Sequence, residues 1–116
     1  MKKEQSLKEW LNEERRYNRA CYISSRLRGI LADMTRLEEK KPEGMRDDKR
    51  IENLKNERKI LAQEGVNISP NDNETIEKML SYGKRLEREE ARYSLEKEAA
   101  AKRNAAILSE RVDHER

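Results

Sequence analysis

Several residue types are scarce in this chain of 116 residues, and each scarcity narrows the possible folds and activities. The sequence contains no Phe, one Trp, one Cys, one His, two Pro and four Gly. Hydrophobic residues make up only 34% of the chain, which leaves a thin apolar stripe on each helix rather than a thick core. Such stripes are usually completed by another copy or another protein, so we expect a homo-oligomer with a protein partner.

The single cysteine, Cys21, excludes an intrachain disulfide and is typical of a reducing compartment. The first residues, Met1 to Gln5, lack the apolar run of a signal peptide, and no apolar run reaches the length of a membrane span. We therefore expect a soluble, cytoplasmic protein with no membrane contact.

The scarcity of His removes the usual catalytic pairings. His114 is the only histidine and lies near the C-terminus, which argues against Cys–His or Ser–His catalysis and against a multi-His metal site. Neighbouring carboxylates such as Glu13 and Glu14 are unremarkable in a chain with 24 acidic residues, and the isolated glycines form no nucleotide-binding loop. We predict that the protein is not an enzyme and holds no metal or cofactor.

Charge is what the chain has in abundance. Charged residues make up 44% of it, with 27 basic and 24 acidic side chains and a net charge of +3. Apolar residues return every three or four positions between these charges, a spacing that predicts long, solvent-exposed helices. Disorder of the whole chain is disfavoured because helical spacing, cap residues and a lack of breakers occur together.

Breaker residues divide the chain into three predicted helices, at about 6–41, 46–64 and 71–113. Ser6 and Glu9 have the spacing of a capping box. Pro42 and Gly44 end the first helix, and the short turn predicts an antiparallel hairpin with the second. Gly65 is expected as a left-handed cap. The predicted fold is all-α: a helical hairpin plus a long third helix, elongated and coiled-coil-like, in one domain spanning residues 1–116.

The first predicted helix has two apolar faces, which appear when residues are projected at about 100° each. One face carries Leu7, Trp10, Leu11, Tyr17, Cys21 and Tyr22, and the nearly opposite face carries Ile23, Leu27, Ile30, Leu31, Met34 and Leu37. Either a straight helix serves two partners, or it bends or breaks near Ser24 and Ser25. The second helix can cover only the later face. We therefore predict a partner interface at Leu7, Trp10, Leu11 and Tyr17, with ordinary intrachain packing of Trp10 as the alternative.

The third predicted helix starts either with Pro70 as its first residue or with Asn71 as its cap. It carries two apolar patches on one side, formed by Ile76, Met79, Leu80, Gly83 and Leu86 and by Ala101, Ala105, Leu108 and Val112. Between them the same side carries Glu87, Glu90, Ser94, Lys97 and Glu98. This middle stretch is either solvated or part of a charge network between helices that sets partner choice.

Basic residues form a band of nearly one sign on the first helix. The band consists of Lys8, Arg15, Arg16, Arg19 and Arg26, and among acidic residues only Asp33 reaches its edge. Clustered arginines can grip phosphates or an acidic protein surface. The alternative is a solvated face whose charges are balanced by acidic residues of the second or third helix.

These features predict a non-catalytic helical interaction protein, a homodimer that binds another macromolecule as a regulatory adaptor, inhibitor or assembly factor. The alternative is a nucleic-acid-binding accessory protein that uses the basic band of the first helix.

Overall fold

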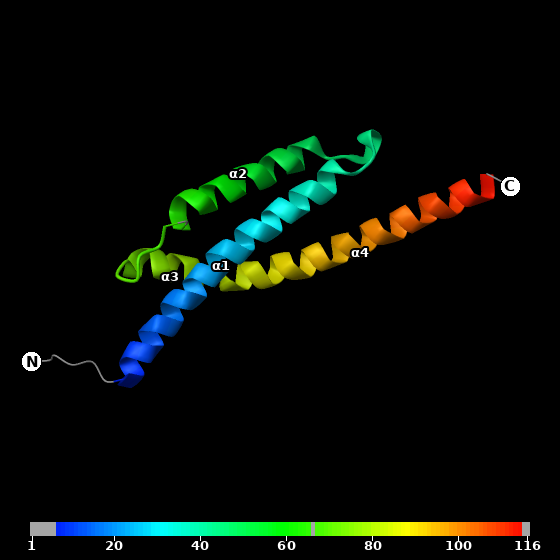
Figure 1. The fold of residues 1–116 in the computed structure, drawn as a ribbon. Helices are drawn as coiled ribbons and strands as arrows, with labels where there is room; N and C mark the ends of the chain where they lie inside the picture. Colours follow the sequence, from blue (N-terminus) through cyan, green and yellow to red (C-terminus); the bar gives the residue numbers. More distant parts are fainter. Residues whose placement is uncertain (1–6, 66, 115–116) are drawn as a thin grey trace, which may run out of the picture.

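The apolar stripe from Ile23 to Met34 lies at the centre of an elongated all-α fold, which confirms the predicted fold class (Figure 1). The computed structural model describes residues 7–65 and 67–114, with side chains as far as Leu108. The elements are α1 (Leu7–Glu39), the 3-10 turn η1 (Glu43–Met45), α2 (Asp48–Gly65), α3 (Asn73–Ser81) and α4 (Gly83–His114). The molecule measures 82 × 26 × 18 Å, so its two ends are far apart.

The antiparallel hairpin of α1 and α2 contains most of the core (Figure 1). One cluster consists of Ile23, Leu27, Ile30, Leu31, Met34, Leu54, Leu61 and Leu86. These residues recur at three- and four-residue spacing, which places them on one face of each helix. The later apolar face of α1 is therefore covered by α2, as predicted, and by the first turn of α4.

α1 is one continuous helix through Ser24 and Ser25, which settles the choice left open by the change of face. The Ser24 hydroxyl is buried and donates a hydrogen bond of 3.2 Å to the carbonyl oxygen of Gly65 at the end of α2. The serine thus joins the two helices where α1 changes partners. The first half of α1 keeps its apolar residues on the opposite side, away from the hairpin.

Gly65 is required by a close approach of three helices. A Cβ atom on Gly65 would lie 2.6 Å from the Met79 sulfur of α3 and 2.9 Å from the Ser24 hydroxyl oxygen of α1. No glycine among the described residues has a positive φ. The predicted left-handed cap is therefore wrong, because this glycine serves the contact between helices rather than an unusual backbone conformation.

The predicted third helix is bent at Tyr82 into α3 and α4. Tyr82 ends α3 and donates its backbone N–H to the Met79 carbonyl oxygen at 3.1 Å, and α4 then begins at Gly83. The start of α3 also differs from both predicted caps. Asp72 is the N-cap, and its carboxylate accepts the Thr75 backbone N–H at 3.1 Å.

The two apolar patches of the predicted third helix differ in their packing. Leu86 is buried and Tyr93 packs partly against the core, but Ala101, Ala105 and Leu108 are exposed. These three residues project on the same side of α4 as Leu86, so the second patch continues along that side without being covered by the described chain. Two other predictions cannot be compared directly, since Ser6 and the side chain of Val112 lie outside the described residues.

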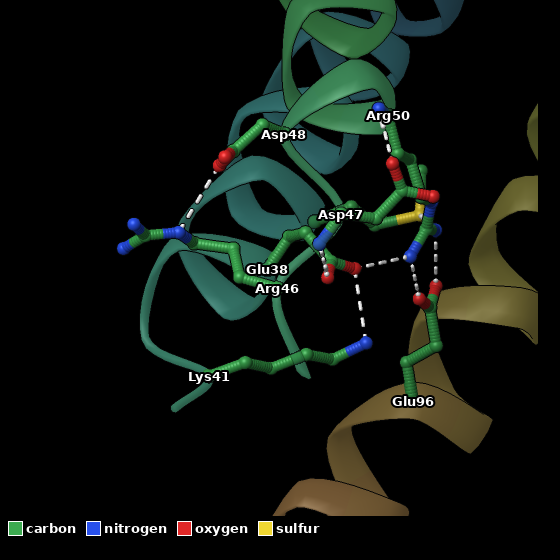
Figure 2. Close-up of polar contacts among 8 residues, drawn as sticks. Glu38, Lys41, Arg46, Asp47, Asp48, Arg50 and Glu96 are labelled. Atoms are coloured by element: carbon green, nitrogen blue, oxygen red, sulfur yellow. Dashed lines mark hydrogen bonds and ion pairs between the residues drawn. The ribbon is translucent and has the colours of Figure 1, made fainter. Parts of the chain in front are cut away.

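A buried carboxylate joins the hairpin turn to α4 (Figure 2). Glu38 is only 1% exposed, and its oxygens accept hydrogen bonds from the Asp47 backbone N–H at 2.9 Å, Lys41 Nζ at 3.0 Å and Arg50 at 2.9 Å. Arg50 also donates to both carboxylate oxygens of Glu96 on α4, at 2.5 and 2.9 Å. We call Glu38, Lys41, Arg50 and Glu96 the turn network.

The turn network includes a residue from the middle of the predicted third helix, for which the sequence allowed either a solvated surface or a charge network between helices. Glu87, Ser94, Lys97 and Glu98 are exposed, so the solvated interpretation holds for them. A charge network between helices is nevertheless present, but it uses Glu96, which the sequence analysis did not select. Glu96 lies on the side of α4 that faces the hairpin, where it accepts hydrogen bonds from Arg50.

We expect Gly65→Ala to lower the free energy of unfolding by about 1–3 kcal/mol, the usual cost of forcing an extra methyl group into a packed site. Urea titration followed by circular dichroism measures this change. Gly29→Ala is the matched control, because a Cβ there meets nothing within 4 Å. The control is expected to stabilise α1 by about 0.5–1 kcal/mol. Equal stability of Gly65→Ala and wild type would show that Met79 and Ser24 move aside at no cost.

We expect acid to destabilise the protein through Glu38. Burial raises the pKa of Glu38, but the hydrogen bonds from Asp47, Lys41 and Arg50 outweigh it and hold that pKa below its ordinary value of 4.5. A carboxyl group that is harder to protonate in the folded state stabilises the fold above the unfolded-state pKa. This contribution is lost as the pH falls from about 4.5 through the lower folded-state pKa.

Glu38→Gln should therefore flatten the fall in unfolding free energy between about pH 5 and pH 3, although it lowers stability at neutral pH. Urea midpoints collected across this pH range provide the measurement. Glu39→Gln, at the exposed neighbouring position, is the control and should keep the wild-type slope. If Glu38→Gln keeps the wild-type dependence of unfolding free energy on pH, Glu38 is not the group whose protonation destabilises the fold in acid.

Candidate partner-binding surface on α1

The first half of α1 projects beyond the rest of the molecule (Figure 1). Its side away from the hairpin carries Leu7, which is 72% exposed, Trp10, which is 50% exposed, and half-buried Leu11. Tyr22 is also exposed and lies further along the same side. We call Leu7, Trp10, Leu11 and Tyr22 the outward face of α1. Much of this face stays in contact with water, and exposed Leu and Trp side chains raise the free energy of the chain in water.

Tyr17 has a different environment from the other predicted interface residues. Its ring packs against the cluster of Ala20, Ile76 and Met79, and its hydroxyl donates a 3.3 Å hydrogen bond to the Ile68 carbonyl oxygen. The interaction with the Cys21 side chain raises the pKa of Tyr17, which keeps the hydroxyl protonated as a donor. Tyr17 therefore supports the loop before α3 and contributes only its edge to the outside.

A shallow groove runs beside Trp10, between α1 and the loop that precedes α3. Its volume is about 460 Å³, and it is lined by Trp10, Glu13, Glu14, Tyr17, Asn18, Pro70 and Asn71. Sequence reasoning treated Pro70 and Asn71 only as candidate helix starts. No local signal could have placed them here, because the contact joins segments about fifty residues apart and depends on the Tyr17 hydrogen bond to Ile68.

The basic band divides into one paired residue and four free ones. Arg16 forms an ion pair of 3.0 Å with Glu77 of α3. Lys8, Arg15, Arg19 and Arg26 are exposed, and none of them appears in an ion pair among the described residues. The expectation that acidic residues of other helices balance the band therefore holds only for Arg16. The remaining four side chains present uncompensated positive charge along α1.

The outward face and the basic band are adjacent surfaces of the same helix. On a projection of about 100° per residue, Lys8, Arg15, Arg19 and Arg26 lie beside Leu11 and Tyr22. Trp10 borders the opposite edge, next to the groove with Glu13 and Glu14. A partner on this half of α1 would meet apolar side chains in the middle, cations on one side and an aromatic ring with carboxylates on the other.

Comparisons with protein-family models, with curated proteins and with solved structures find no match for this chain. Within residues 7–65 and 67–114, none of the helices combines the length and apolar character needed to cross a membrane. The same part of the chain gathers no three His, Cys, Asp or Glu side chains that could hold a metal ion. The outward face of α1 is therefore the starting point for a functional proposal.

Proposed function

We propose that this protein is a non-catalytic helical interaction protein, which forms a homodimer and binds another macromolecule through the outward face of α1. One observation carries the proposal: Leu7 and Trp10 stay exposed on a helix whose opposite face is packed into the core. Apolar side chains on a projecting helix gain free energy when a partner covers them. The roles that fit are those of an adaptor, an inhibitor or an assembly factor in the cytoplasm.

Trp10 is the main anchor in this proposal. Aromatic side chains dominate the energetics of interfaces because they bury a large area with few rotatable bonds. About half of the Trp10 side chain is already covered beside the groove, which restricts its conformations before binding. Binding a partner therefore costs less side-chain conformational entropy. Leu7 lies about one turn before Trp10, and Leu11 follows it directly; both extend the apolar contact.

We expect sedimentation equilibrium at micromolar concentration to detect a species heavier than the 13.8 kDa chain. Trp10→Ala should weaken this association by about 2 kcal/mol or more, the usual threshold for an anchor residue, while the helical content stays unchanged. Ile60→Ala is the matched control, because Ile60 is 53% exposed on α2, away from the outward face. A monomer at all concentrations, or equal effects of the two variants, would contradict the proposed dimer.

A second candidate function is nucleic-acid binding through the free part of the basic band. Its support is the lack of any ion pair at Arg15, Arg19 and Arg26 within the described chain. Unpaired guanidinium groups keep their full capacity to bind phosphates and to release counterions. The apolar outward face beside them favours a protein partner instead, so we rank this function second.

Replacing Arg15, Arg19 and Arg26 together by Glu should abolish any binding to generic duplex DNA, and wild-type binding should fall steeply as salt rises. Fluorescence anisotropy with a labelled duplex measures both effects. The matched control replaces Lys49, Arg58 and Lys59, three exposed residues of α2, by Glu. If the variant with Arg15, Arg19 and Arg26 replaced by Glu still binds DNA at physiological salt, the basic band is only a solvated surface.

A further inference from the structure

A second exposed face, on α4, combines positive charge with apolar side chains. It consists of Arg88, Ala91, Arg92, Leu95, Ala99 and Lys102, which we call the α4 stripe. All six residues are exposed. On a helical projection they fall within an arc of about 100°, and they extend for about 21 Å along the axis. The stripe lies on α4, whereas the outward face and the basic band lie on α1.

The charge of the α4 stripe has one sign. Between Gly83 and Leu108, no acidic residue projects within the arc of the stripe. Arg92 makes a long contact of 3.7 Å with Glu89, and Lys102 lies 4.0 Å from Glu98, both within α4. Arg88 has no ion pair among the described residues. Exposed contacts of this length contribute little, so the three cations are available to a partner.

The apolar centre of the stripe is equally distinct. Leu95 is 68% exposed, more than any other large apolar side chain of α4 as far as Leu108, and Ala91 and Ala99 lie one turn to either side. An open groove of about 650 Å³ follows the stripe and is lined by Arg50, Arg88, Ala91, Arg92, Leu95 and Glu96. The small alanines leave room for another helix to approach closely, and Leu95 offers it an apolar contact.

We infer that the α4 stripe is a docking site for an acidic amphipathic helix of a partner protein. Carboxylates on the edges of such a helix meet Arg88, Arg92 and Lys102, and its apolar row meets Leu95. Charge complementarity selects the sign of the partner and speeds the encounter. Nucleic acid fits less well, because a phosphate backbone has nothing to place against Leu95 and the alanines.

The turn network borders this site, because Arg50 and Glu96 line the groove beside Leu95. Glu96 accepts both Arg50 hydrogen bonds and so joins α4 to α2 at this point. Leu95, the preceding residue, stays exposed. The two arginines of the stripe are four residues apart, so one helical partner can bind both with carboxylates at the same spacing.

The test uses the full chain and a synthetic amphipathic peptide of about 20 residues, with Leu at heptad core positions and Glu and Ala elsewhere. A second peptide carries Lys in place of every Glu. Isothermal titration should show binding of the acidic peptide and at least about tenfold weaker binding of the basic one. Arg88→Glu combined with Arg92→Glu should weaken binding of the acidic peptide by about tenfold or more.

Leu95→Ala is the second variant, and it should lower the affinity for the acidic peptide by about threefold to tenfold without changing any charge. The matched control, Arg58→Glu combined with Lys59→Glu, makes the same charge reversal at exposed residues of α2 and should leave peptide affinity within about twofold of wild type. Circular dichroism verifies that each variant keeps its helical content.

Three outcomes would overturn the inference. The first is no binding of the acidic peptide, or equal binding of both peptides. The second is an equal loss in the α2 and α4 charge-reversal variants, which would indicate attraction by net charge alone. The third is a preference for nucleic acid: duplex DNA binds the protein more tightly than the acidic peptide does. In that case DNA affinity would fall when Arg88 and Arg92 are replaced by Glu and would not change in Leu95→Ala. These outcomes leave the dimer proposed for the outward face of α1 unaffected, because that surface is tested separately with Trp10→Ala.

Discussion

The ion pair between buried Glu38 and Arg50 determines how the rest of the chain is arranged. Glu38 lies in the last turn of α1 and is almost fully shielded from water, so its charge must be neutralised within the protein. Arg50 does this from the first turn of α2 and uses its other donors on Glu96 of α4. Removing one partner from a buried pair of this kind costs about 3–5 kcal/mol. The hairpin turn and the direction of α4 therefore depend on the same guanidinium group.

A thin core explains why two helix faces stay uncovered. α1 packs against α2, α3 and α4, and it supplies most of the fully buried side chains. Once its inner face is filled, the described part of the chain offers no further apolar layer that covers Trp10 or Leu95. Long helices in a single layer leave such surfaces to other molecules, which links the composition of the chain to the two proposed binding sites.

Local spacing in the sequence predicts which residues share a face, but not which face becomes covered. The change of apolar face before Ser24 was visible from periodicity, and in the structure the later face is packed, whereas Leu7 and Trp10 on the earlier face are exposed. The role of Gly65 was not predictable, because it depends on Met79 from another helix. The pairing of Arg50 with Glu96 was missed for the same reason, since it joins two helices at positions 46 residues apart.

Near balance of charge in the whole chain does not produce an evenly mixed surface. Helical spacing gathers like charges, as at Arg15 and Arg19 on α1 and at Arg88 and Arg92 on α4, each pair four residues apart. Acidic side chains such as Glu38, Glu77 and Glu96 instead form ion pairs that join one helix to another. Because these carboxylates are paired with cations of other helices, Arg15 and Arg19 on α1 and Arg88 on α4 have no ion pair within the described chain. A net charge of only +3 is therefore compatible with two strongly basic surfaces, one beside an aromatic anchor and one around an exposed leucine.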